Sequence, residues 1–172
     1  MDRHKLLEHI RESLASISAP RFFETERGFQ GALLTQLENR IPNYVLPEGA
    51  LIEQEHQKSP AQHGLRIRPD IIIHEPFKPE RHSTRTEGNI AVIELKLNAS
   101  KVRAQNDFNS LAEMINVLQY PLGIFINIAS HKTHSELVPL SVKDLIVCFA
   151  VSLDNGHVKV VENGTQPISQ QR

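Results

Sequence analysis

The amino-acid sequence predicts an α/β protein in which helices flank a central mixed β-sheet. Apolar residues recur at helical spacing over the first 40 residues and again over residues 101–119. Runs that are typical of strands lie between and after these helices. The expected order is helix, helix, three strands, helix, strand and a β-hairpin, and this order favours a sheet with helices packed on its faces.

The first 40 residues predict two helices. The first spans residues 2–17, and the stretch 18–20 ends it and begins a second helix, from about residue 21 to residue 40. Their apolar faces are formed by Leu6, Leu7, Ile10, Leu14 and Ile17, and by Phe22, Phe29, Leu33, Leu37 and Ile41. Gly28 and Gly31 each weaken the second helix by about 1 kcal/mol, unless they allow a close approach.

Three strands are expected next. The first spans residues 50–56, and the second spans residues 64–74 with the β-branched run Ile71-Ile72-Ile73. A polar loop with two prolines, residues 75–88, leads into the third strand at residues 89–97. This pattern places three strands in succession between the second and third helices.

The remaining elements are one helix and three strands. The helix at residues 101–119 carries an apolar stripe of Ala104, Phe108, Leu111, Ile115 and Leu118. Residues 122–128 predict a short strand that is buried on both faces. Two strands over residues 145–153 and 157–161 flank Asp154-Asn155-Gly156, which strongly indicates a β-hairpin.

Length and composition exclude several classes of protein. The chain has 172 residues, about one domain's worth, and a net charge of −1, which excludes a strongly cationic coat for nucleic acid. Cys148 is the single cysteine and lies in an apolar run, so we expect a buried structural thiol. His131 and His134 lack a third ligand at the usual spacing, and we interpret them as surface histidines. Without a membrane-length apolar stretch or a secretory signal pattern, we expect a soluble, cytoplasmic protein.

Three charged residues interrupt otherwise apolar strands. Asp70 directly precedes the isoleucine run, and Glu94 and Lys96 lie within Ala91–Leu97. Because side chains alternate along a strand, Glu94 and Lys96 project from the same face. Charges on so apolar a strand are costly to desolvate unless something compensates them. If the two strands are neighbours, Asp70 lies beside Glu94 and the lysine lies next to both.

Two convergent carboxylates offer hard oxygen ligands for Mg2+ or Mn2+. Magnesium takes one or two carboxylates, several waters and phosphate oxygens, and the backbone carbonyl of Leu95 offers another ligand. Lys96 would hold or deprotonate a water beside the metal and offset charge on the phosphate, which fits hydrolysis of a phosphodiester. A Glu-x-Lys triplet alone occurs by chance about once in a chain of this length. The alternative interpretation is a structural ion network.

The pair Pro69-Asp70, followed by Glu94-Leu95-Lys96, resembles the signature of the PD-(D/E)xK nuclease superfamily, which has the restriction-endonuclease-like fold. The resemblance covers roughly residues 24–128 and includes the αβββαβ order of the superfamily core. It implies that Asp70 and Glu94 bind a metal ion and that Lys96 assists the attacking water. It also implies a glutamate on the preceding helix that completes the site.

Glu24 and Glu26 are the candidates for that glutamate. At about 100° per residue, Glu26 falls on the side of Phe29 and Leu33, whereas Glu24 falls opposite Leu33. We therefore expect Glu26 to support the metal and Glu24 to be a solvated charge. The resemblance further implies one nuclease-like domain, with an N-terminal helix (1–19), a catalytic core (20–128) and a C-terminal extension (129–172).

Candidate nucleic-acid contacts lie near the predicted site. Lys101 and Arg103 stand where the helix after the Glu-x-Lys strand begins, and helix N-termini favour phosphate. Gln105 lies further along the same helix, and Arg68 shares the strand face of Asp70. The alternative for these residues is a solvated face or pairing with a carboxylate.

The sequence therefore predicts a Mg2+- or Mn2+-dependent nuclease, an endonuclease with DNA as the preferred substrate. Nothing in the sequence excludes RNA. The alternative is a catalytically silent nuclease-like module that binds DNA or a partner protein, but a retired site has no reason to keep buried charges. The near-neutral charge and the single site per domain favour a homodimer or a larger nuclease complex.

Overall fold

The N-terminal helix forms where the apolar spacing predicts it. In the computed structural model, which describes residues 2–42, 44–54 and 67–163, α1 spans Arg3–Ala15. The carboxylate of Asp2 caps it by accepting the backbone N–H groups of His4 and Lys5 at 3.0 and 3.3 Å. Three apolar side chains of the predicted face, Leu6, Ile10 and Leu14, are fully buried.

The predicted second helix is divided into two. A short 3-10 helix, η1, covers Pro20–Phe23, and α2 spans Glu26–Arg40. Thr25 causes the break, because its hydroxyl oxygen accepts the N–H of Gly28 at 3.0 Å and so caps the start of α2. A Cβ at Gly28 would lie 2.8 Å from that hydroxyl, so the glycine makes room for the cap.

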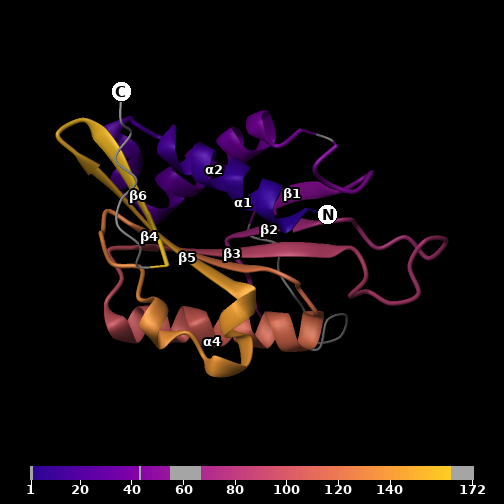
Figure 1. Cartoon of the computed structure of the whole chain (residues 1–172). Helices are drawn as coiled ribbons and strands as arrows, with labels where there is room; N and C mark the ends of the chain where they lie inside the picture. The colour runs from indigo at the N-terminus through magenta and orange to yellow at the C-terminus, as the bar shows by residue number, and fades with distance from the viewer. Residues whose placement is uncertain (1, 43, 55–66, 164–172) are drawn as a thin grey trace.

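Six strands form one mixed sheet, which confirms the predicted fold class. Their order in the sheet is the order in the chain, β1-β2-β3-β4-β5-β6 (Figure 1). The strands are β1 (Leu51–Gln54), β2 (Ile71–His74), β3 (Asn89–Leu97), β4 (Gly123–Ile128), β5 (Ile146–Asp154) and β6 (His157–Glu162). The pairs β3–β4 and β4–β5 are parallel, and the other three neighbouring pairs are antiparallel.

The second strand is shorter than the sequence predicts. Residues 67–70 are not strand, and residues 64–66 of the predicted strand, like residues 55–56 of the first, lie outside the described ranges. Proline explains the late start of β2, because Pro69 has no N–H for a ladder and disfavours regular pairing around it. The other strand boundaries fall within one residue of those expected.

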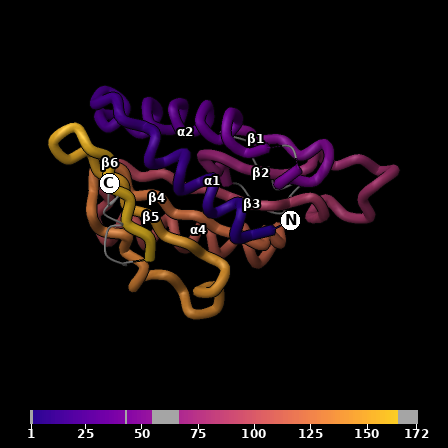
Figure 2. The backbone as a smooth tube through the Cα atoms, turned by 45° about the horizontal axis from the view of Figure 1, so that its top comes forward, coloured from indigo at the N-terminus to yellow at the C-terminus, as the bar shows by residue number. Residues whose placement is uncertain are grey.

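Helices cover both faces of the sheet. Figure 1 shows α1 and α2 on one side and α4 (Lys101–Leu118) on the other, and Figure 2 shows α1 and α2 running side by side over the sheet. Two 3-10 helices, η2 (Ser135–Leu137) and η3 (Leu140–Leu145), pack near α4. Each layer has its own apolar core: Phe29 and Leu33 belong to the first, and Phe108 and Leu111 to the second.

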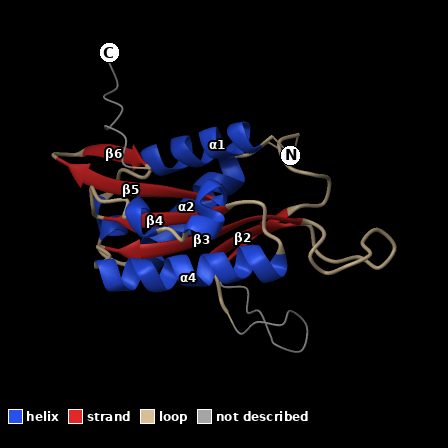
Figure 3. Ribbon diagram, turned by 60° about the horizontal axis from the view of Figure 1, so that its bottom comes forward, coloured by secondary structure: helices blue, strands red, loops and turns tan. Residues whose placement is uncertain are grey.

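Two connections join antiparallel neighbours in the sheet. Asn155 and Gly156 join β5 to β6 with φ of 50° and 80°, the left-handed conformation that a two-residue hairpin turn requires. The loop of residues 75–88 joins β2 to β3 and projects from one end of the sheet (Figure 3). The β2–β3 hairpin is therefore antiparallel, and this direction sets the neighbours of Asp70.

Candidate active site

Asp70 and Glu94 lie side by side at the start of β2. The register pairs Ile71 with Ile93, and continuing it by one residue places Asp70 opposite Glu94. Asp70 Oδ2 accepts the backbone N–H of Leu95 at 2.7 Å, which anchors the carboxylate on β3. The two carboxyl groups also share a hydrogen bond. The structure thus brings together the two acids that the strand pattern singles out.

Burial raises the pKa of both carboxyl groups. For Asp70, desolvation outweighs the hydrogen bond from Leu95 and the charge of Lys96, so its pKa lies above the ordinary value. Glu94 is 7% exposed, and desolvation together with the charges of Asp70 and Asp107 puts its pKa well above the ordinary value. Two acids this close cannot both ionise cheaply, which adds to the cost of burying them.

Lys96 lies between carboxylates from opposite layers. Its Nζ atom is 3.6 Å from Glu26 Oε1 on α2 and 3.6 Å from Asp107 Oδ1 on α4. Burial alone would lower the pKa of the ammonium, but Asp107, Glu26, Asp70 and Glu94 together raise it. Lys96 is therefore charged, and its side chain retains 18% of its exposure.

Glu26, and not Glu24, reaches this cluster. Glu26 Oε2 accepts the backbone N–H of Leu97 at 2.9 Å and a hydrogen bond from Arg103 Nη2 at 3.1 Å. Glu24 follows η1 and is exposed. The helical-wheel argument selects Glu26, and the structure likewise places Glu26 beside Lys96. A role of Glu26 in supporting a metal ion stays a prediction. We call Glu26, Asp70, Glu94, Lys96 and Asp107 the Lys96 cluster.

Asp107 is a member of the cluster that the sequence argument missed. It lies on α4, its side chain is 15% exposed, and burial raises its pKa to about 6 against the opposing charge of Lys96. Its Oδ2 atom is buried and has no hydrogen-bond partner within the described part of the chain. A signal was present: Asp107 falls between Ala104 and Phe108 in the apolar stripe, where an acid is out of place.

The sequence argument also missed Gln30, which like Asp107 is a polar residue on the buried face of a helix. It lies one turn after Glu26 on the buried face of α2 and is 4% exposed. Its side-chain Nε2 donates to the backbone carbonyl of Asp70 at 2.7 Å. Gln30 therefore fixes the main chain that carries the first acid of the pair.

The carbonyl of Leu95 remains a suitable ligand position. The N–H and C=O of one strand residue point to the same side, and the N–H of Leu95 points to Asp70. The β2–β3 register, if extended, places Pro69 opposite Leu95, and proline has no N–H to donate to that carbonyl. Pro69 thus cannot donate a ladder hydrogen bond to the Leu95 carbonyl, which lies on the edge of β3 where the Leu95 N–H contacts Asp70.

The residues present fit a divalent cation of the magnesium kind. No group of three or more His, Cys, Asp or Glu side chains within residues 2–42, 44–54 and 67–163 could hold a metal ion. Magnesium needs one or two carboxylates and takes its remaining oxygens from carbonyls, water and phosphate. Asp70, Glu94 and the Leu95 carbonyl supply that set, and the surplus of acids over cations in the Lys96 cluster favours a positive charge.

The predicted nucleic-acid contacts have protein partners. Arg103 donates to Glu26 and to the Leu97 carbonyl, at 3.1 and 3.4 Å, and Lys101 Nζ lies 4.0 Å from Glu136 Oε1.

Gln105, one turn into α4, is likewise engaged. Its amide donates to Asn109 Oδ1 at 3.2 Å and to the Leu137 carbonyl at 3.3 Å. Arg68 is exposed next to Pro69. The structure therefore places Arg103 against Glu26 of the Lys96 cluster and Gln105 in a link to η2, and phosphate contact by any of these residues stays a prediction.

The interpretation of both loop histidines as surface residues is wrong for His134. His131 is exposed, but His134 is 5% exposed and its Nε2 donates to the carbonyl of Ala99 at 3.0 Å. A backbone φ of 54° turns the side chain inward, which spacing alone does not reveal. His74, at the end of β2, pairs with Glu53 of β1 at 2.6 Å.

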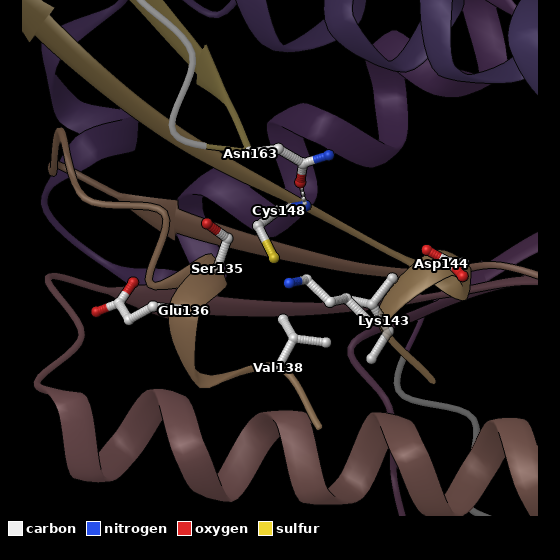
Figure 4. Close-up of a pocket in the computed structure, with 8 residues that line it drawn as sticks. Ser135, Glu136, Val138, Lys143, Asp144, Cys148 and Asn163 are labelled. Atoms are coloured by element: carbon white, nitrogen blue, oxygen red, sulfur yellow. Dashed lines mark hydrogen bonds between the residues drawn. The ribbon is translucent and has the colours of Figure 1, made fainter. Parts of the chain in front are cut away.

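A pocket of about 420 Å³ lies outside the Lys96 cluster, along β5 and the 3-10 helices (Figure 4). Lys143, Asp144 and Asn163 line it, and Cys148 stands at its wall. Cys148 is wholly buried, as expected, and burial raises the pKa of its thiol to about 12. The thiol is therefore protonated and unreactive at neutral pH.

The described helices include none that is both long and apolar enough to cross a membrane. No protein-family model and no curated protein matches the chain. Among solved structures, SfsA of Pyrococcus furiosus in complex with Ca2+ matches with a TM-score of 0.37 and 13% sequence identity. The match covers 78% of this chain and 61% of that one, so the chain spans less than two thirds of SfsA. At this TM-score, we infer nothing about function from the match.

Proposed function

We propose that the protein is a divalent-cation-dependent nuclease that hydrolyses phosphodiester bonds, with DNA as the substrate and Mg2+ or Mn2+ as the cation. One observation supports this above the others: two acids with raised pKa values stand together beside a charged lysine. Asp70 and Glu94, with the Leu95 carbonyl, would hold the cation. When bound, the cation would polarise a phosphate oxygen and lower the pKa of a water.

The side chains of the Lys96 cluster would divide the remaining work. The Lys96 ammonium has three N–H donors, and two carboxylates account for two directions. The third would hold the attacking water or offset the charge that develops on the phosphate. Glu26 would orient β3 through the Leu97 N–H, and Gln30 would hold the Asp70 main chain. Each role is one that the observed contacts allow.

The charge distribution supports a polyanionic substrate at this position. Arg103 and Lys101 begin α4 next to the cluster, and the partners that they contact are exposed or half-buried carboxylates. A phosphate can compete for these side chains, because exposed ion pairs contribute little to stability. The net charge of −1 favours a second copy or a larger complex to supply more of the nucleic-acid surface.

The alternative is a module that binds DNA or a partner protein without cleaving it. A specific observation favours it in part: Lys96 is already ion-paired on two sides, as a structural lysine would be. The buried surplus of acids speaks against it, since such a surplus destabilises a fold that has no cation to bind.

The test is cleavage of supercoiled plasmid DNA in Mg2+ or Mn2+, with a chelator as the negative arm and an RNA oligonucleotide in parallel. We expect the wild-type protein to nick or linearise the plasmid and the chelator to stop it. Asp70→Asn removes a proposed ligand charge and should lower the rate at least about 100-fold.

Asp144→Asn is the matched control, because Asp144 is an exposed aspartate outside the Lys96 cluster. Its rate should equal that of the wild type. Cleavage that persists undiminished in Asp70→Asn would remove the site from the mechanism. Wild-type protein that binds DNA and never cuts it would establish the binding module instead.

A further inference from the structure

The ammonium of Lys96 is held by two carboxylates that approach from opposite sides of the sheet. Glu26 comes from α2 in one helical layer, and Asp107 comes from α4 in the other. The two distances are both 3.6 Å, so neither acid dominates the position of the nitrogen. Lys96 thus contacts side chains from both helical layers.

We infer that Asp107 is a positioning residue, which holds the Lys96 ammonium beside Asp70 and Glu94 and does not itself bind the cation. This inference rests on the proposed function, because it concerns the lysine of that site. Asp107 belongs neither to the strand motif of Asp70, Glu94 and Lys96 nor to the helix that carries Glu26.

Glu26 alone cannot keep Lys96 centred. Its Oε2 atom already accepts from the Leu97 N–H and from Arg103, so this carboxylate is fixed by the end of β3 and the first turn of α4. A lysine paired with Glu26 alone would be drawn toward that side. Asp107 supplies the opposing attraction and keeps the ammonium on the face of β3 that carries Glu94.

Asp107 is placed where an apolar residue would stabilise the fold better. It lies in the stripe of α4 that packs on the sheet, and its Oδ2 atom is buried without a hydrogen-bond partner in the described ranges. Leaving a buried acceptor unpaired costs about 1–3 kcal/mol. Retaining an acid there is understandable if its charge is used, and the contact that uses it is the one with Lys96.

The start of α4 is anchored, and this anchoring fixes the reach of Asp107. Ser100 caps the helix by accepting the Arg103 N–H at 3.3 Å. Asn127 Oδ1 accepts the N–H of Ala99 at 2.8 Å, and His134 donates to the carbonyl of the same residue at 3.0 Å. The turn from β3 into α4 is therefore clamped on both main-chain groups of Ala99, and the first turns of α4 cannot shift freely.

The experiment compares Asp107→Asn, which is isosteric and neutral, with Asp107→Glu, which keeps the charge. Glu136→Gln is the matched control, since Glu136 contacts a different lysine, the exposed Lys101. The first measurement is the NMR signal of the Lys96 side-chain ammonium in protein with 15N-labelled lysine, assigned by its absence in Lys96→Met. The others are the Mn2+ affinity and, on DNA, kcat and KM. Thermal melting verifies that each variant is folded.

We expect the Lys96 ammonium signal in the wild type and in Glu136→Gln, because an ammonium held by carboxylates exchanges its protons slowly. Asp107→Asn should lose or shift this signal, and Asp107→Glu should restore part of it. With Asp107→Asn, kcat should fall about 10- to 100-fold, as for residues that orient a metal site, with Mn2+ affinity and KM within about twofold.

Two results would overturn the inference. An unchanged ammonium signal in Asp107→Asn would show that Asp107 does not hold the lysine. A loss of Mn2+ affinity as large as that of Asp70→Asn would make Asp107 a ligand. The NMR measurement does not depend on catalysis. A wild-type protein that never cleaves DNA would therefore contradict the proposed function, and the NMR spectrum would still decide whether Asp107 positions Lys96. If Asp107→Asn does not fold, Asp107→Ser takes its place in all arms.

Discussion

Two regions of the molecule each place a lysine beside one or more acidic side chains. The pKa values of these acids are shifted in opposite directions in the two regions. In the Lys96 cluster, burial raises the pKa of Asp70, Glu94 and Asp107. At the β5–β6 hairpin, Lys159 Nζ lies 2.9 Å from Asp154 Oδ2 with His131 nearby, and the hydrogen bond from Lys159 lowers the pKa of Asp154. We call these three residues the hairpin cluster.

The contrast shows that residue types alone do not decide what a charged cluster does. The hairpin cluster is exposed and its charges balance, so solvent and neighbours compensate each group. The Lys96 cluster is largely desolvated and carries four acids around one lysine. Its surplus of acids is a cost to the fold, whereas the hairpin cluster carries no such surplus. Three measurements would sharpen or break this contrast.

A divalent cation should produce the largest difference between the two clusters. We expect saturating Mg2+ or Mn2+ to stabilise the wild-type protein by about 2.7 kcal/mol at a hundredfold excess over Kd. Asp70→Asn should abolish the increase in Tm, and Asp154→Asn should leave it intact. Calorimetric melting with and without the cation is the measurement. Equal cation responses in the two variants would contradict the comparison.

Removal of each lysine should separate the clusters next. Lys96→Met removes the one ammonium among the four acids of the cluster and should lower the free energy of unfolding by about 2 kcal/mol at pH 7, less than for a fully buried pair because Lys96 keeps some exposure. Lys159→Met should lower Tm less than Lys96→Met does, because Lys159 is exposed and its partner Asp154 is only half-buried. Urea denaturation of both variants measures the difference, and similar losses would mean that burial is not what distinguishes the clusters.

The pH dependence of stability should show a smaller effect. The pKa of Asp107 rises from 3.8 to about 6 on folding, so between these pH values the folded protein binds more protons than the unfolded one. The stabilisation is complete below pH 3.8 and is lost as the pH rises through about 6. Asp107→Asn should lack this loss, on the order of 1 kcal/mol after screening by solvent. A wild-type and an Asn variant with parallel pH profiles in urea denaturation would contradict it.

Most of the elements that were predicted correctly follow from patterns within their own segments of the sequence. The nine-residue run of β3, the apolar stripe of α4 and the Asn155-Gly156 turn each determine an element within its own segment. The errors occur where a side chain competes with the periodic pattern. Thr25 begins a new helix inside the predicted one, and Pro69 removes the early part of β2.

The candidate site was predictable in the strands, but of its helical residues only Glu26 was selected from the sequence. Glu94 and Lys96 stand out because a strand alternates with a period of two, so a charge among isoleucines is visible at once. Asp107 and Gln30 stand in helical stripes, where a polar residue is unusual but its position does not identify the partner it contacts. That Asp107 meets Lys96 depends on how α4 packs over the sheet, and no local pattern contains that information.

The Lys96 cluster is assembled from residues between 26 and 107, on α2, β2, β3 and α4. Contacts across such long segments carry a large loop-closure entropy, so we expect them to be completed late in folding. Repulsion among the acids then raises the free energy of the folded protein more than that of the folding transition state. Its main effect is therefore on the unfolding rate. A bound cation would accordingly lengthen the lifetime of the folded chain and leave the speed of its folding nearly unchanged.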